Sequence, residues 1–213
     1  MKRNLFLSLL LLAATGCQSV YFGAMEKIGV HKRDIMVSRV KAARDAQDDT
    51  KEQFVSAMEA FKSVVNFKGG DLEKKYNHLN SVLLKSEAGA QEVRDRIDAV
   101  ESVSRALFRE WRAEIKQYSN RELARSSQEK YDLTMDKYED LIAAMKKAES
   151  KLEPALVPLR DQVLYLKHNL NASAITGLSS ELISVQTNVD RLVREMEASI
   201  AEADRFIATL QEQ

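Results

Sequence analysis

Apolar side chains recur along most of the chain at alternating steps of three and four residues, the spacing of a helix that buries one face. The pattern is cleanest near the C-terminus. The apolar seam there comprises Leu178, Leu182, Val185, Val189, Leu192 and Met196, followed by Ile200, Ala203, Ile207 and Leu210. The step from Met196 to Ile200 adds one residue of phase to the repeat. This shift predicts a local change of supercoil in the last helix.

The same spacing predicts three further long helices upstream. The third has a nearly unbroken seam of Tyr131, Met135, Tyr138, Ile142, Met145, Ala148, Leu152, Leu156, Leu159, Val163, Leu166 and Leu170. The second has a looser seam of Leu72, Tyr76, Leu79, Leu83, Val93, Ile97, Val100, Val103, Leu107 and Trp111. The first runs from about His31 to Phe67 and is weakest between Ala43 and Gln53, where most side chains are small or charged. We interpret the seam residues as core rather than as a cofactor site.

Short polar segments separate these helices. Residues 68–71 combine a pair of glycines with Asp71, which can cap the following helix. Residues 119–122 have the sequence of a capping box, and residues 126–129 repeat that signature. If neither segment ends a helix, the second and third helices form one continuous rod. Residues 169–173 predict the third turn.

Two prolines interrupt the third helix, although its apolar spacing continues through them. Pro154 and Pro158 each remove a backbone hydrogen bond and clash with the preceding turn, which costs about 3 kcal/mol in a helix interior. We therefore expect a kink or a restart near Glu153. The break serves either as a hinge or docking bend, or as a curvature that lets the helix follow its neighbours, and we favour the second interpretation.

These elements predict an all-α fold for residues 31–213. Short connections place consecutive helices antiparallel. Segments of about 37 to 50 residues would be roughly 55 to 75 Å long. The chain has only 7 Gly and 2 Pro, as expected for long helices with few connections. The predicted architecture is an elongated antiparallel helical bundle or coiled coil of about four long helices.

The N-terminus has the organisation of a bacterial lipoprotein signal peptide. Lys2 and Arg3 precede an apolar stretch that ends at Ala14, and Cys17 is the only cysteine of the chain. We expect residues 1–16 to be removed by cleavage between Gly16 and Cys17. Lipoproteins usually carry Leu, Val or Ile where this chain has Ala14. The alternative is therefore an ordinary secretory peptide with an incidental cysteine.

Lipidation of Cys17 would give the mature chain a membrane anchor. The thiol would carry a diacylglyceryl group and the new amino group an acyl chain, and two or three chains together anchor stably. No later segment has the roughly 20 apolar residues that a transmembrane helix needs. Gln18 resembles the residue after the cysteine in outer-membrane lipoproteins of Gram-negative bacteria, which implies a protein that faces the periplasm. Residues 17–30 form a short membrane-proximal segment, whose apolar side chains rest at the headgroups or close one end of the bundle.

The charge balance argues against a nucleic-acid partner. The chain has 32 basic and 32 acidic side chains, and loss of Lys2 and Arg3 with the signal peptide leaves a net charge of about −2. General binding of nucleic acid requires a net basic face. With its sole thiol lipidated, the mature chain can form no disulfide, so its stability must come from packing.

The sequence contains none of the common catalytic signatures that we considered. It has no GxxxxGK[ST] loop, no HExxH and no GxSxG. A di-iron bundle needs Glu-x-x-His pairs, but Ile28, Lys75 and Tyr165 stand three residues before the three histidines. We expect no enzymatic activity, no metal and no cofactor other than the lipid on Cys17.

Two polar clusters are candidate interaction sites. The first comprises Lys32, Arg33, Arg39, Lys41 and Arg44 and would face anionic headgroups or a negatively charged envelope polymer. The second comprises Arg160, Asp161, Gln162, Lys167, His168, Asn169 and Asn171. A solvated helix face explains the first cluster, and turn and capping chemistry explains most of the second. The strongest candidates are Lys32, Arg33, Arg39, Arg160, Lys167 and His168.

Several segments resemble one bacterial lipoprotein family. They are YFGAMEKIG at residues 21–29, KRDIMV at 32–37, FKGGDL at 67–72 and PLRDQVLYLKHNLN at 158–171. They are similar to the family known as domain of unknown function 2959, over nearly all of residues 17–213. The resemblance implies an envelope lipoprotein with coiled-coil character and brings no activity, cofactor or catalytic residue with it.

Together these features predict a non-enzymatic, outer-membrane-anchored helical rod that acts as a scaffold or adaptor in the cell envelope. Its expected partners are the membrane, through the lipid, and envelope proteins or further copies of the chain. The alternative is a bundle that handles a lipid or another ligand in the groove between its amphipathic helices. The apolar residues near Cys17 and the methionines in the seams suggest that alternative.

Overall fold

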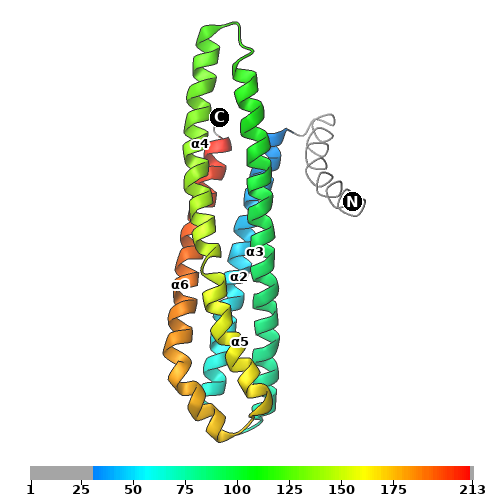
Figure 1. Cartoon of the computed structure of the whole chain (residues 1–213), viewed down its shortest axis with the longest axis vertical. Helices are drawn as coiled ribbons and strands as arrows, with labels where there is room; N and C mark the ends of the chain where they lie inside the picture. Colours follow the sequence, from blue (N-terminus) through cyan, green and yellow to red (C-terminus); the bar gives the residue numbers. More distant parts are fainter. Residues whose placement is uncertain (1–30, 212–213) are drawn as a thin grey trace, which may run out of the picture.

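The computed structural model describes residues 31–211, and these form an all-α rod (Figure 1). Its helices are α2 (Lys32–Val65), α3 (Leu72–Ile115), α4 (Arg121–Glu149), α5 (Leu152–His168) and α6 (Ala172–Gln211). Helices α4 and α5 follow one another along a single arm, so the rod has four antiparallel columns. The predicted helical bundle is therefore confirmed. The predicted signal peptide, Cys17 and the membrane-proximal segment lie outside the described residues.

The turn between α2 and α3 forms where the glycine pair predicted it. Gly69 and Gly70 have φ angles of 141° and 105°, a region that side chains other than glycine rarely adopt. The Asp71 carboxylate then accepts a hydrogen bond from the Lys74 amide at 2.9 Å and caps α3. The sequence-based prediction for this turn is confirmed.

The second turn separates α3 from α4, so the two helices are not one rod. The Asn120 side chain accepts hydrogen bonds from the Glu122 amide at 2.9 Å and from the Leu123 amide at 3.2 Å. The cap is therefore Asn120 rather than Ser119. Residues 126–129 lie inside α4 and end no helix. The third turn, between His168 and Ala172, falls where it was predicted.

The expected restart near Glu153 is also present. Helix α4 ends at Glu149 and α5 begins at Leu152. Pro154 is the third residue of α5, where a backbone amide would lack an intrahelical partner in any case, while Pro158 stands inside the helix. Both α4 and α5 pack against α3 and α6. The break thus keeps the arm against the same two neighbours, as expected for a curvature that lets the third helix follow them.

The middle of α2 packs more closely than its small and polar side chains suggested. Ala43, Gln47 and Thr50 are each at most 1% exposed. On α3, Gly89 faces them so closely that a Cβ atom there would lie 2.7 Å from the Thr50 hydroxyl and 2.5 Å from the Gln53 side-chain oxygen. The small residues therefore permit a close approach of α2 and α3 and do not weaken the seam.

The predicted change of phase in α6 is wrong. Ser199 is fully buried and Ile200 is only partly buried. The buried seam runs through Met196, Ser199, Ala203, Phe206 and Leu210 and keeps its steps of three and four. Ser199 occupies this core position because its hydroxyl donates a hydrogen bond to the Gln47 side-chain oxygen at 2.8 Å. Apolar spacing alone assigned the position to the neighbouring isoleucine.

The Gln47–Ser199 hydrogen bond leads to a stability prediction. Ser199→Ala leaves the buried Gln47 oxygen without its donor, so the free energy of unfolding should fall by about 1 to 3 kcal/mol. Urea unfolding followed by circular dichroism measures this change. Combining Ser199→Ala with Gln47→Leu removes both polar groups and should recover most of the loss.

Ser180→Ala is the matched control for this prediction. Ser180 lies on the same helix but is exposed, so this substitution should change the free energy of unfolding by less than about 0.5 kcal/mol. Equal effects of Ser199→Ala and Ser180→Ala would show that the buried hydrogen bond contributes nothing to stability.

Candidate functional site

Three chain segments meet at the end of the rod where α2 begins. The Lys32 ammonium lies 2.8 Å from a Glu110 carboxylate oxygen of α3, and the lysine side chain is only 12% exposed. The Arg33 guanidinium donates to the carbonyl oxygen of Leu210 in the last turn of α6. These contacts place the start of α2 and the end of α6 beside the same part of α3.

Helices α3 and α4 continue past this point as a hairpin (Figure 1). We call residues 111–130 of this hairpin the tip. The tip has five basic and three acidic side chains. It also exposes Tyr118 at 46% and Leu123 at 55%. A basic surface with an exposed tyrosine and leucine is a surface that can bind a partner.

An aromatic cluster closes the four-helix core at the base of the tip. Phe108 lies edge-on to Tyr131 with 5.6 Å between ring centroids, and Tyr138 bridges from Phe108 at 5.4 Å to Phe206 of α6 at 6.3 Å. Trp111 adds a further ring 5.7 Å from Tyr131. Rings at these separations pack favourably beyond their burial alone. The cluster therefore joins the base of the tip to the end of the bundle.

Hydrogen bonds orient the polar edges of these rings. The Trp111 indole N–H donates to the Ser127 hydroxyl at 2.9 Å, and Arg112 donates to the Tyr131 hydroxyl at 2.7 Å. The Tyr138 hydroxyl lies 2.8 Å from the Ser104 hydroxyl. Burial raises the pKa of Tyr138 above its usual value, and the hydrogen bond to Ser104 opposes this shift.

An open groove lies beside the aromatic cluster. It has a volume of about 220 Å³, and its apolar lining comes from Leu107, Trp111 and Leu210. The Lys32–Glu110 ion pair lies along the same groove. Such a groove can accept an apolar side chain, and His31, Arg33 and Glu114 add polar groups to its lining.

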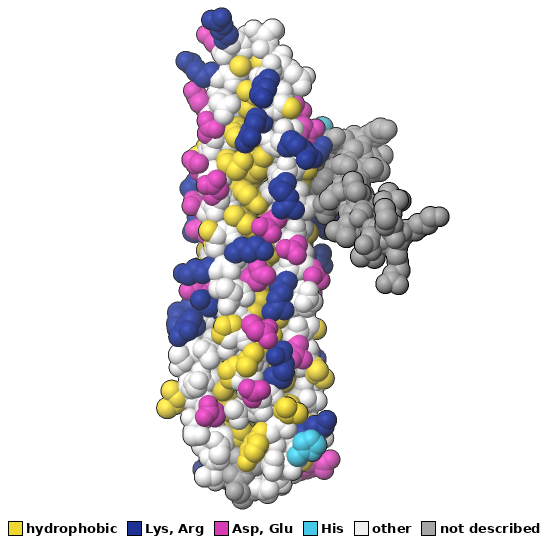
Figure 2. All heavy atoms as spheres, viewed as in Figure 1, with side chains coloured by type: hydrophobic (Ala, Val, Ile, Leu, Met, Phe, Trp, Pro, Cys, Tyr) yellow, Lys and Arg dark blue, Asp and Glu magenta, His cyan; other side chains and the backbone are white. Residues whose placement is uncertain are grey.

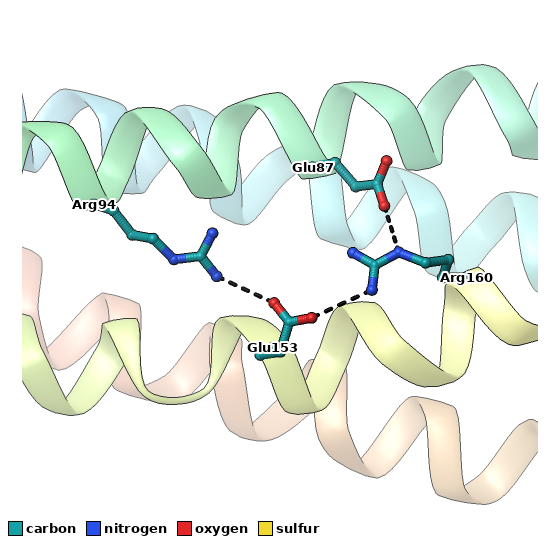
Figure 3. A network of polar contacts seen from close by, with 4 residues as sticks. All are labelled: Glu87, Arg94, Glu153 and Arg160. Atoms are coloured by element: carbon teal, nitrogen blue, oxygen red, sulfur yellow. Dashed lines mark hydrogen bonds and ion pairs between the residues drawn. The ribbon is translucent and has the colours of Figure 1, made fainter.

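The second candidate cluster lies on α5, away from this end of the rod. Arg160 contacts the Glu87 carboxylate at 2.7 Å and the Glu153 carboxylate at 3.3 Å, and Glu153 in turn contacts Arg94 at 3.2 Å (Figure 3). The hydrogen bonds to Glu87 and then Glu153 raise the pKa of Arg160. Lys167 and His168 are exposed in the last turn of α5, where positive charge suits the helix dipole.

The structure therefore does not bring the six predicted interaction residues together. Lys32 and Arg33 make contacts within the bundle at one end, and Arg39 is partly buried beside Glu92 and Asp95. The other three lie on α5, in the opposite half of the rod. Basic and acidic side chains alternate along the face shown in Figure 2, with apolar side chains exposed between them.

The amino-acid sequence matches a known protein family. A model of the family described as "Protein of unknown function (DUF2959)" matches residues 21–210. The chain belongs to this family. A comparison with curated proteins found no match. Within the described residues of this DUF2959 chain, no group of His, Cys, Asp or Glu is arranged to hold a metal ion. None of the helices within residues 31–211 is long and apolar enough to cross a bilayer.

Sequence reasoning missed the overhang of the tip and the buried Gln47–Ser199 pair. The signal for the overhang was the difference in helix length, because α3 has 44 residues and α2 has 34. The buried pair gave no signal of its own. Serine and glutamine are mostly surface residues, and only the packing of α2 against α6 shows that these two are buried.

Tyr138 gives a testable pH dependence. Because its pKa is raised in the folded chain, its contribution to stability is complete below about pH 10 and is lost as the pH rises through the folded-state pKa. Tyr138→Phe cannot ionise there, so the melting temperature of this variant should fall less than that of wild type between pH 9 and pH 11. In this variant the Ser104 hydroxyl still donates a hydrogen bond to the Glu101 carbonyl, so Tyr138→Phe should change the melting temperature little at neutral pH.

Thermal unfolding across this pH range provides the measurement, with Tyr165→Phe as the control. Tyr165 is 47% exposed, and its substitution should leave the wild-type pH profile unchanged. Identical profiles for all three proteins would contradict the role given to Tyr138.

Proposed function

We propose that this DUF2959 chain is a non-enzymatic lipoprotein of the outer membrane that extends into the periplasm as a scaffold or adaptor. The lipid on Cys17 holds the chain at the membrane. The rod keeps its ends at a set separation and presents polar surface to envelope proteins. The observation that carries the proposal is the combination of a lipoprotein-type N-terminus with a single rod that begins shortly after it.

The interior of the rod supports a mechanical role. A single cluster of buried apolar residues includes side chains from every described helix, from Met36 and Val64 on α2 to Leu210 on α6. Well-packed interiors resist compression, and the four columns brace one another along their shared length. With α3 about 66 Å long, the rod suits a spacer between a membrane and a partner.

The distribution of surface charge supports binding of partners at the flanks and ends of the rod rather than binding of one extended, negatively charged polymer. Ion pairs such as Arg44–Asp204 and Lys147–Glu195 join neighbouring helices and offset basic charge along the flanks. The mature chain has a net charge of only about −2. This pattern fits binding to a limited protein surface and does not favour nucleic acid as a partner.

Cys17→Ala tests the anchor. The lipid requires the thiol, so the variant should move from the membrane fraction to the soluble periplasmic fraction, while its circular dichroism and melting temperature match those of soluble residues 18–213. Fractionation with immunodetection measures the change. Retention of the variant in the outer membrane would show that something other than this lipid holds the protein there.

Proximity labelling tests the scaffold role. A labelling enzyme fused to the C-terminus should enrich particular envelope proteins in wild type relative to Cys17→Ala. The comparison is informative because both proteins have the same rod and differ only in anchoring. Enrichment of no envelope protein over the variant would contradict the scaffold proposal.

A further inference from the structure

We propose that the tip is a membrane-contacting surface, which rests on the anionic headgroups of the leaflet that holds the Cys17 lipid. The rod would then stand on its α3–α4 end, with the turns at residues 66–71 and 169–171 directed away from the bilayer. This inference rests on the proposed anchoring of Cys17, and adds the orientation of the rod and the surface that maintains it.

The length of the connecting segment favours this orientation. From Cys17 to Lys32, the first residue of α2, the chain spans roughly 50 to 54 Å when every residue is fully extended. Helix α2 has 34 residues and is about 51 Å long, so a segment attached at its start reaches the level of the far end only at full extension. The tip, in contrast, extends past Glu110, which lies beside the start of α2, by the last five residues of α3, about 8 Å, and the turn of residues 116–120. The tip can therefore stand on the membrane with the connecting segment in many conformations, whereas the opposite end can do so only with a fully extended segment.

The side chains of the tip suit a bilayer surface. Tyr118 and Leu123 are exposed close to the turn, and tyrosine is enriched at the level of lipid headgroups. Within the described residues, Lys116 and Arg121 form no ion pair, and the Arg125–Glu129 pair is 3.7 Å long with both side chains more than 70% exposed. These basic groups are therefore free to approach phosphate oxygens.

The basic residues of α2 are less available for this role. Lys32 lies against Glu110, Arg33 against the Leu210 carbonyl, and Arg44 against Asp45 and Asp204. Each basic side chain near an anionic membrane contributes only modestly to binding, so the tip by itself would bind weakly. The lipid anchor compensates for this by holding the tip at high effective concentration near the bilayer.

Charge alone would not distinguish the two ends of the rod. Lys68, Lys74 and Lys75 lie near the turn at the far end, so that end is also basic. The length of the segment from Cys17 to Lys32 makes the difference, because only the tip meets the membrane without full extension of that segment. The far-end lysines therefore provide a matched control for the charge of the tip.

Single-cysteine labelling of the lipidated full chain tests the orientation. The lipid occupies the native thiol, so Leu123→Cys at the tip, Ile183→Cys on the side of α6 and Leu170→Cys at the far turn each supply one reactive thiol. Each variant is labelled with a fluorophore and reconstituted into phosphatidylcholine vesicles that contain phosphatidylglycerol and a headgroup-nitroxide lipid. Quenching at position 123 should exceed quenching at positions 170 and 183 by about threefold or more.

Charge reversal tests the chemistry. Arg121→Glu combined with Arg125→Glu should lower the quenching at position 123 at least twofold, while the protein still floats with the vesicles. Lys68→Glu combined with Lys74→Glu makes the same change of charge at the far end and should leave that quenching unaltered. In vesicles whose only phospholipid besides the quencher is phosphatidylcholine, quenching at position 123 of the protein without charge reversal should be as low as that of the charge-reversed tip variant.

The alternative outcomes separate the two proposals. Equal quenching at all three positions means that the rod lies flat, and an unquenched tip on vesicle-bound protein means that the tip is covered or directed away. Either result overturns the membrane-contact proposal and leaves the anchor intact. Protein that does not float with the vesicles overturns the anchor, and the orientation inferred from it fails as well.

Discussion

The rod depends on the register at which α2 meets its two neighbours. A purely apolar seam can slide by one repeat and still bury apolar side chains, so hydrophobic contact alone does not select an alignment. Here α2 approaches α3 most closely at Gly89, where no larger residue fits without displacement of Thr50 or Gln53. On the other side, Gln47 accepts its hydrogen bond from Ser199 of α6. A slip of either helix would break this hydrogen bond and leave the buried Gln47 oxygen without its donor.

The arrangement of the helices at the end of the rod where α2 begins follows from this register. With α2 aligned as it is, Lys32 meets Glu110 and Arg33 meets the end of α6. The remaining residues of α3 and the first turns of α4 have no helix beside them on that side within the described residues. The aromatic cluster then seals the exposed end of the four-helix core. The overhanging tip and the groove beside the start of α2 are thus consequences of packing that originates near the middle of the rod.

Charged side chains complete the surface but do not determine the fold. The Arg94–Glu153–Arg160–Glu87 network joins α5 to α3 just after the break in the third column (Figure 3). Its members are 30% to 54% exposed, and ion pairs in such settings typically contribute less than about 1 kcal/mol each. Apolar burial along the columns supplies most of the cohesion, which leaves surface residues available for partners. The proposed scaffold role is consistent with this division between a packed interior and a polar exterior.

The sequence by itself determined the helical class, the main turns and the restart near Pro154, because these depend on local chemistry. A three–four apolar repeat, a glycine pair before Asp71 and a proline in a helix have nearly the same consequences in any surroundings. Cys17 likewise carries a local signal, which remains a prediction about residues outside the described chain. Only the tertiary structure decided that Ser199 rather than Ile200 enters the core, that small residues bring α2 and α3 together, and that the candidate basic residues lie in opposite halves of the rod. These outcomes depend on the partner across the interface, and no spacing within one helix specifies the residue that a neighbouring helix will place opposite it.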